Sequence, residues 1–121
     1  MDPAPRSTDP RQRLGRHGER LAARWYRDQG YLLLDANWRC PDGELDLVLA
    51  RDDTVVFCEV KTRNGSRFGT AAEAVTPRKQ ARVRRLATTW LRSRSDRPWP
   101  RLRFDVAAID RGRLEVVEGA F

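Results

Sequence analysis

Hydrophobic positions along the first half of the chain change their spacing several times, and each change marks an expected element. From Leu14 to Gln29 apolar residues recur every three or four positions, which is typical of an amphipathic helix, and Gly30 supplies its stop. A strand then begins at residue 31 and fades through residue 39. Apolar residues alternate or run continuously over 44–51 and 54–61, as strands do. The pattern therefore predicts one helix followed by three strands.

The second half of the chain shows one helical stretch and two further strands. Thr76 and Pro77 have the chemistry of an N-cap and a first helical residue, and the helical spacing continues to about Arg94. Residues 101–109 alternate as a strand, and a turn at 110–113 leads to a short strand at 114–118. Short turns make the first three strands an antiparallel meander. The helical crossover makes strand 101–109 parallel to strand 54–61.

The turn between strands 44–51 and 54–61 fixes an expected register. If Asp52 and Asp53 form a two-residue hairpin loop, counting outward places Asp46 opposite Glu59 and Glu44 opposite Lys61. Directly opposed residues on one face of a sheet have Cβ atoms about 4.5–5.5 Å apart. The sequence thus predicts a cluster of three acids and one lysine on one face of this hairpin.

Two opposed carboxylates repel, so a cluster of this kind favours a bound cation, and oxygen ligands suit Mg²⁺. An adjacent ammonium would complete an arrangement suited to phosphodiester hydrolysis. The alternative is a set of solvated charges on an exposed sheet. Apolar residues that share the acidic face favour the first interpretation: Val48, Ala50, Val55 and Phe57. The opposite face of the hairpin is expected to be core: Leu45, Leu47, Leu49, Val56, Cys58 and Val60.

Length and charge add a domain organisation and a class of partner. The 121 residues suit one domain, expected over 14–121, after a polar, proline-containing tail at 1–13. A net charge of +7 and a pI near 10.6 favour a polyanionic partner such as nucleic acid or an anionic membrane surface. Arginine enrichment from genome composition is the alternative. Only Lys61 and Lys79 among the 24 basic residues are lysines, which makes Lys61 more informative, because an arginine would serve poorly at that position.

Several classes of site and location are disfavoured. No run of about 18 apolar residues and no apolar signal segment is visible, so neither a membrane span nor secretion is expected. Cys40 and Cys58 form no C-x-x-C motif, which favours a reducing, cytoplasmic setting without a zinc or iron–sulfur site. His17, the single histidine, has no partner motif for a histidine-dependent triad.

Further charged residues lie outside the hairpin. Glu19 lies beside the apolar stripe of helix 14–29, either as a partner of the helix dipole or as a third acid reaching the hairpin. Lys79 and Gln80 begin the second helix, from which they could reach back to the hairpin. Arginines on the glycine-containing loop 62–70 and on the outer face of the second helix are either phosphate contacts or solvated charges: Arg63, Arg67, Arg78, Arg82 and Arg85. Asp105 is expected to anchor Arg103 or a loop.

The order of these motifs resembles a known family. Acids on adjacent strands, Asp46 and a Glu59-x-Lys61, are similar to the restriction-endonuclease-like PD-(D/E)-x-K superfamily. From about Gly15 to Glu118 the chain more closely resembles the YraN-type family of small bacterial, Holliday-junction-resolvase-like proteins. The motifs that carry this resemblance are Gly18-Glu19-x-x-Ala22, Gly30-Tyr31, Asn37-x-Arg39, Gly43-Glu44-Leu45-Asp46-Leu47, Phe57-Cys58-Glu59-Val60-Lys61-x-Arg63, Phe68-Gly69 and Arg103-Phe104-Asp105-Val106.

The resemblance implies an α/β restriction-endonuclease-like domain with a mixed sheet flanked by helices, and a nuclease that uses Mg²⁺ or Mn²⁺. By position, Asp46, Glu59 and Glu19 would be metal ligands, and Lys61 the catalytic lysine. Glu44 would be a spare ligand or an ion-pair partner. Leu45 replaces the superfamily's proline, and Gln80 lacks the tyrosine four residues later that RecB-like exonucleases have.

The sequence therefore favours a metal-dependent endonuclease acting on branched or structured DNA. A nucleic-acid-binding module that keeps the fold without turnover is the main alternative, and a structural protein whose acids bind a cation is a third. Resolvase-like folds often act as homodimers. Trp99, between Pro98 and Pro100, is the candidate exposed aromatic for such a surface.

Overall fold

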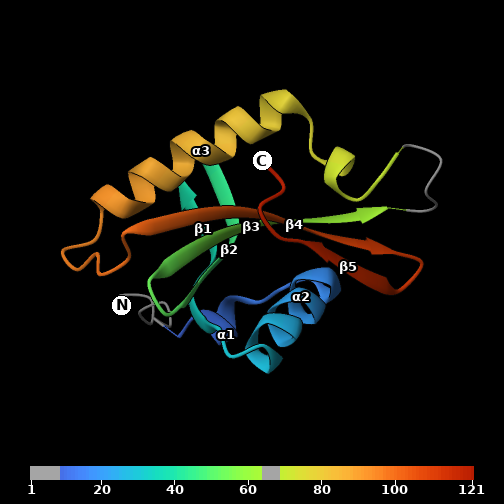
Figure 1. Ribbon diagram of the computed structural model, residues 1–121, viewed down its shortest axis with the longest axis horizontal. Helices are drawn as coiled ribbons and strands as arrows, with labels where there is room; N and C mark the ends of the chain where they lie inside the picture. The colour runs from blue at the N-terminus through green and yellow to red at the C-terminus, as the bar shows by residue number, and fades with distance from the viewer. Residues whose placement is uncertain (1–8, 64–68) are drawn as a thin grey trace, which may run out of the picture.

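A single mixed sheet with helices on both faces forms the molecule (Figure 1). The computed structural model describes residues 9–63 and 69–121. Helix α3 crosses one face of the sheet, and helices α1 and α2 lie on the other. The elements in chain order are α1 (Pro10–Arg13), α2 (His17–Asp28), β1 (Leu32–Cys40), β2 (Gly43–Arg51), β3 (Thr54–Arg63), the 3₁₀ helix η1 (Ala72–Ala74), α3 (Pro77–Arg92), β4 (Arg101–Asp110) and β5 (Arg113–Val117).

The strand order in the sheet is β1-β2-β3-β4-β5. All neighbouring pairs are antiparallel except β3 and β4, which are parallel and are joined through α3. The predicted meander and helical crossover are therefore confirmed. This small α/β domain, with a five-stranded mixed sheet between helices, agrees with the restriction-endonuclease-like fold that the motifs imply.

Each face of the sheet has its own hydrophobic core. On the α2 face, Tyr26 is fully buried, and its ring meets the Tyr31 ring edge to face with centroids 5.1 Å apart. On the α3 face, Phe57 meets Trp90 edge to face at 5.7 Å. Cys58 is buried in the α2-face core, as expected for a thiol that behaves as a small hydrophobe. The two cores fix the positions of α2 and α3 on opposite faces of β3.

Asp105 on β4 is the centre of a buried polar network in the α2 face. It accepts hydrogen bonds from Arg103 Nε at 2.8 Å, from the Tyr26 hydroxyl at 2.6 Å and from the Gly119 backbone N–H at 3.0 Å. The expectation that Asp105 anchors Arg103 is confirmed. The network joins α2, β4 and the C-terminal segment, which lie far apart in the sequence.

The hairpin register is confirmed for one part of the β2–β3 pair only. Arg51 pairs with Thr54, and the ladder continues regularly to Leu47 opposite Cys58, where it ends. Asp46 and Glu59 are therefore not a ladder pair, and neither are Glu44 and Lys61. Beyond Leu47 the two strands separate, and β3 continues its pairing with β4 alone.

A reversal of faces accompanies this separation. Ala36 and Leu47 are paired and lie in the α2-face core, whereas the next pair on the same side of the ladder, Trp38 and Leu45, packs in the α3-face core. Asn37, which lies between them on β1, has a left-handed φ of 53°, a conformation that asparagine tolerates better than most residues. The prediction that Leu45 shares a core face with Leu47 is therefore wrong, because this backbone twist was not visible in the alternation.

The N-terminal segment begins helix formation earlier than the sequence pattern indicated. Pro10–Arg13 form α1, and the next helix starts at His17 rather than at Leu14. Arg13 fastens this segment to β1, because its Nη1 lies 2.7 Å from Asp35 Oδ1 and its carbonyl accepts a hydrogen bond from Asn37 Nδ2 at 2.8 Å. Residues 1–8 of the expected tail lie outside the described residues.

Trp99 is not the free aromatic that its flanking prolines suggested. Its half-buried ring lies 6.0 Å from that of Trp90, and the Arg94 guanidinium lies 5.5 Å from its centroid. Trp99 therefore closes one end of the α3-face core. Within the described residues, no helix has the length and apolar character needed to cross a membrane.

Candidate metal centre

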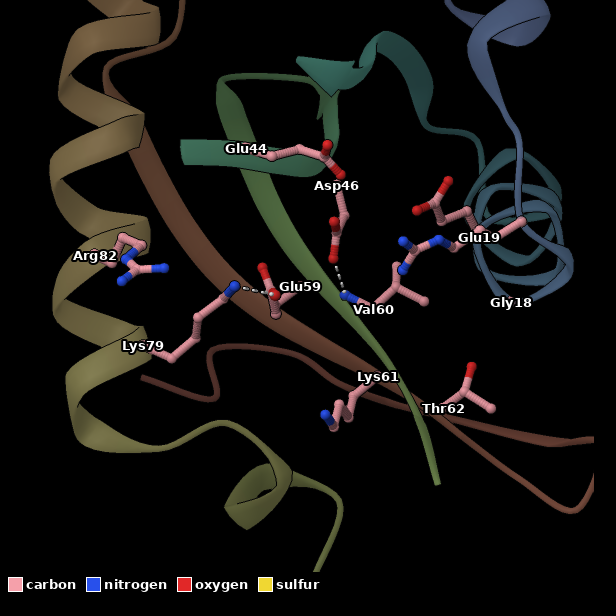
Figure 2. Close-up of a pocket in the computed structure, with 11 residues that line it drawn as sticks. Gly18, Glu19, Glu44, Asp46, Glu59, Val60, Lys61, Thr62, Lys79 and Arg82 are labelled. Atoms are coloured by element: carbon pink, nitrogen blue, oxygen red, sulfur yellow. Dashed lines mark hydrogen bonds and ion pairs between the residues drawn. The ribbon is translucent and has the colours of Figure 1, made fainter. Parts of the chain in front are cut away.

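A cavity of about 460 Å³ opens where β2 and β3 separate, between the first turns of α2 and α3 (Figure 2). It brings together the four acids singled out in the sequence and the only two lysines of the chain. Its lining consists of Arg16, Gly18, Glu19, Glu44, Asp46, Glu59, Val60, Lys61, Thr62, Lys79 and Arg82. The acids thus converge through the separation of the strands rather than through direct pairing across them.

Asp46 occupies the point where the ladder ends. Its Oδ2 accepts a hydrogen bond from the Val60 backbone N–H at 2.8 Å, so the side chain takes over a bond that a regular strand would make with its backbone (Figure 2). Burial, together with the negative charge of Glu59, raises the pKa of Asp46 to about 7, although the bond from Val60 acts in the opposite direction. A nearby cation would stabilise the charged form of this buried carboxyl.

Glu19 reaches Asp46 because α2 lies unusually close to β3. A Cβ atom at Gly18 would lie 3.0 Å from Thr62 Oγ1 and 3.2 Å from Ile109 Cδ1, so this contact needs a glycine. Glu19 is only 3% exposed, and its Oε2 accepts a hydrogen bond from Asn37 Nδ2 at 2.9 Å. Of the two alternatives that the sequence left open for Glu19, its position favours the acid that reaches the hairpin.

Three carboxylates lie close enough to share one cation. An oxygen from each of Glu19, Glu44 and Asp46 lies within 4.8 Å of the other two. Glu44 also accepts a hydrogen bond from Arg39 Nε at 2.7 Å through Oε2. Glu19 and Glu44 therefore each have one oxygen held by a β1 side chain. A set of carboxylate oxygens with open space beside it is the donor type that Mg²⁺ and Mn²⁺ prefer.

Glu59 is the fourth acid of the cavity and lies on the α3 side of it. Its Oε1 lies 3.3 Å from Lys79 Nζ, whereas its Oε2 is buried with no hydrogen-bond partner among the described residues. Burial raises the pKa of Glu59, although the Lys79 ammonium acts in the opposite direction. A buried carboxylate oxygen without a partner is costly, so this atom fits a cation or a water bound to one.

The predicted catalytic lysine and the arginines predicted to meet nucleic acid lie at different places around the cavity. Lys61, the predicted catalytic lysine, is exposed on β3, and Arg82 lies on α3; both line the cavity. Arg85 lines an adjacent hollow with Arg82, and Arg78 is exposed on the first turn of α3.

Three further residues from the predicted set lie away from the acids or cannot be described. Arg63 Nη1 donates to the carbonyls of Gly69 and Thr70, so it braces the following loop. Gln80 Nε2 donates to the Val75 carbonyl at 3.1 Å, which ties the start of α3 to the end of η1. Arg67 lies outside the described residues.

Sequence reasoning did not assign the residues that hold the carboxylates from β1. Asn37 donates to Glu19 and Arg39 donates to Glu44, and both belong to the Asn37-x-Arg39 motif. Arg16 and Gly18 also line the cavity without having been singled out as site residues. The motif was visible in the sequence, but its contacts depend on the left-handed turn at Asn37.

Comparison with known proteins places the chain among close relatives. Residues 18–109 match a family model described as "Uncharacterised protein family UPF0102". A UPF0102 protein of Frankia alni is 52% identical over 113 residues, which cover 89% of this chain and 93% of the relative. A UPF0102 protein of Nocardia farcinica is 54% identical over 99 residues, covering 82% and 77%. One of Rhodococcus opacus is 52% identical over 113 residues, covering 89% and 95%.

Proposed function

This chain belongs to the UPF0102 family, the YraN-type family that its motifs predict, and we propose that it is a metal-dependent endonuclease acting on branched or structured DNA. One observation carries the proposal. Four carboxylates and both lysines of an arginine-rich chain line the same cavity. Random placement of two lysines among 24 basic residues would seldom bring both to one site.

In this proposal, Glu19, Glu44 and Asp46 hold Mg²⁺ or Mn²⁺, with Glu59 contributing the unpartnered Oε2 directly or through water. The ion, when bound, would activate a water molecule and stabilise the charge that develops on the phosphate. The raised pKa of Asp46 supports this assignment, because a cation would restore the charged form that burial disfavours. The site also fits because its donors are carboxylate oxygens only.

The two lysines would act on the phosphate. Lys61 extends from β3, and Lys79 extends from the first turn of α3 toward Glu59 (Figure 2). A compact ammonium can contact a non-bridging phosphate oxygen and stabilise its charge in the transition state. Lys79 and Arg78 lie at the positive end of the α3 dipole, where cations are unfavourable. An incoming phosphate would relieve that repulsion.

The proposal includes DNA as the partner and a cytoplasmic location, where DNA is found and where thiols such as those of Cys40 and Cys58 stay reduced. The net charge of +7 supports the partner. Contacts from arginines and lysines to the DNA backbone would dominate the affinity, which should fall steeply as salt concentration rises.

The test is cleavage of a labelled four-way junction beside linear duplex and single-stranded controls, in Mg²⁺, Mn²⁺ or EDTA. Wild type should cut in a metal-dependent manner. Glu59→Gln, which keeps the shape of the side chain, should reduce the rate at least 100-fold, on the order of a lost metal or electrostatic contact. Glu115→Gln, a matched change on the exposed surface of β5, should leave the rate unchanged. Cutting that persists in EDTA would rule out the metal mechanism.

A binding module without turnover is the second candidate. Two ion pairs favour it, because Arg39 meets Glu44 and Lys79 meets Glu59, so side chains of the protein already offset part of the acidic charge. Tight, salt-sensitive DNA binding without cleavage under any metal would support this candidate and contradict the first.

A further inference from the structure

The metal centre lies in the middle of a longer trench. A second cavity, of about 510 Å³, shares Arg16, Glu19 and Glu44 with the central one. A third, of about 250 Å³, shares Glu59, Lys61 and Lys79 with it. The three cavities therefore adjoin one another in a row, from the α1–β1 side of the molecule, past the acids, to the start of α3. This row of cavities, which we call the trench, reaches to both sides of the carboxylates.

Charges along this trench follow a regular order. Arg16 and Arg39 line the α1–β1 end, the four carboxylates lie in the middle, and Lys61 and Lys79 line the other end. A DNA backbone fits this order of charges if one phosphate lies beside the acids and their metal ion. The neighbouring phosphates then lie beside the cations on either side.

The two arginines of the α1–β1 end are available to a ligand. Arg16 is exposed at the N-cap position of α2, where its side chain makes no capping hydrogen bond. The Arg39 side chain is 76% exposed and meets Glu44 through Nε, so the rest of its guanidinium is accessible. Arg13 lines the same cavity, but its guanidinium pairs with Asp35 and serves the fold. Arg39 holds Glu44 through Nε and still exposes the rest of its guanidinium, and Arg16 is exposed, so both can contact a ligand.

We propose that the backbone of one DNA strand passes through this trench, with Arg16 and Arg39 contacting phosphates on one side of the metal centre and Lys61 and Lys79 contacting phosphates on the other. The site then acts on bonds inside a strand and requires no free end. This inference rests on the proposed nuclease function and adds the path of the substrate to it.

The first experiment compares closed circular single-stranded DNA with a linear molecule of the same sequence, in Mg²⁺. Equal initial rates of cleavage are expected, because no strand end needs to enter the trench. Cleavage of the linear molecule alone, with products released from one end, would overturn the inference and the endonucleolytic part of the proposed function, while leaving metal-dependent cleavage of DNA intact.

The second experiment needs no turnover. Binding of short oligonucleotides is measured in Ca²⁺, with one phosphate at a time replaced by an uncharged methylphosphonate. In the wild type, replacements on both sides of the central position should weaken binding, each by roughly threefold. If replacements weaken binding on only one side of the central phosphate, the inference is overturned.

Arg16→Ala should abolish the effect of replacement at the phosphate that Arg16 contacts, and leave the phosphate of Arg39 and the other side unchanged. The slope of log affinity against log salt should also fall by about 0.7 for each lost contact on a single strand. Arg24→Ala makes the same change of charge on an exposed part of α2 and should leave the pattern as in wild type. An Arg16→Ala pattern identical to wild type would remove this residue from the path.

The two experiments separate this inference from the proposed function. If wild type cuts neither these substrates nor the four-way junction under any metal, the nuclease function fails, while a two-sided binding pattern still supports the strand path. If wild type cuts and the pattern is one-sided, only the strand path fails.

Discussion

Asn37 combines an uncommon backbone conformation with two hydrogen bonds from its side-chain amide, one of which goes to an acid of the site. Its Nδ2 donates to Glu19 Oε2 and to the Arg13 carbonyl, while its φ of 53° reverses the faces of the neighbouring residues. One residue thus holds a candidate ligand, the N-terminal segment and the twist of β1. A left-handed backbone conformation at a non-glycine residue persists only where the surrounding contacts enforce it, and such residues are frequent at functional sites.

The Asn37→Gly variant should separate the two roles of Asn37, because glycine accepts a positive φ but offers no amide donor. Mn²⁺ affinity, measured by calorimetry, should fall 10- to 100-fold, as is usual when a group that orients a metal ligand is removed. The free energy of unfolding should fall by only about 1–2 kcal/mol. Unchanged metal affinity would show that Asn37 serves the backbone alone.

Asp46 should give the fold a recognisable pH dependence in EDTA. Because burial and Glu59 raise its pKa to about 7, the folded protein binds a proton that the unfolded chain, with the ordinary carboxyl pKa of 3.8, releases between pH 4 and pH 7. The contribution of Asp46 to stability is therefore most favourable near pH 4 and is lost as the pH rises through 7.

The Asp46→Asn variant, which keeps an oxygen to accept from Val60, should flatten this dependence and raise the stability at pH 8 on the order of 2 kcal/mol. Thermal unfolding of both proteins from pH 4 to pH 8 measures the difference. Mg²⁺ should stabilise the wild type and not the variant. A variant less stable than wild type at pH 8 would contradict the assignment.

At the scale of the elements, the contact of α2 with β3 depends on Gly18. In Gly18→Ala, the new Cβ would press against Thr62 Oγ1 and Ile109 Cδ1, at a cost of about 1–3 kcal/mol from overpacking. Removing a glycine from the helix returns about 1 kcal/mol. The net change in stability should be small, whereas the shift of α2 should displace Glu19 and reduce the cleavage rate at least 10-fold.

His17→Ala is the control for this change, because it alters the neighbouring, exposed position of α2, which lines none of the three cavities of the trench. Its rate should equal that of wild type. Equal rates for Gly18→Ala and wild type would show that the α2–β3 spacing does not position Glu19.

Alternation, caps and turn residues were sufficient to predict the order of the main elements and the direction of every strand, because each depends on local chemistry. The Thr76–Pro77 start of α3 is an example, since the Thr76 side chain accepts from the Lys79 N–H. The sequence also identified the acids of the site, but the predicted pairing between them across β2 and β3 was wrong. Counting from the turn assumed a regular ladder, whereas the ladder ends at Leu47 and Cys58. No periodic spacing of apolar residues marks the reversal of sheet faces at Asn37 or the short helix α1.

At the scale of the whole molecule, the Asp105 network joins segments from three parts of the sequence. In Tyr26→Phe, the loss of the 2.6 Å bond to Asp105 should reduce the free energy of unfolding by about 1–3 kcal/mol, because a buried charge loses one of its donors. Metal affinity and cleavage rate should not change, since Tyr26 lines none of the three cavities of the trench. Chemical denaturation beside a cleavage assay would measure both, and a parallel loss of activity would contradict this separation.

The hydrogen bond from Val60 to Asp46 has a practical consequence for spectroscopy. The Val60 amide proton points at a carboxylate that the proposed cation would engage, and its resonance should therefore respond to the ion directly. An amide titration followed by NMR would report ion occupancy in the absence of DNA and of any reaction. The sheet thus contains an intrinsic reporter at the site where its regular bonding ends.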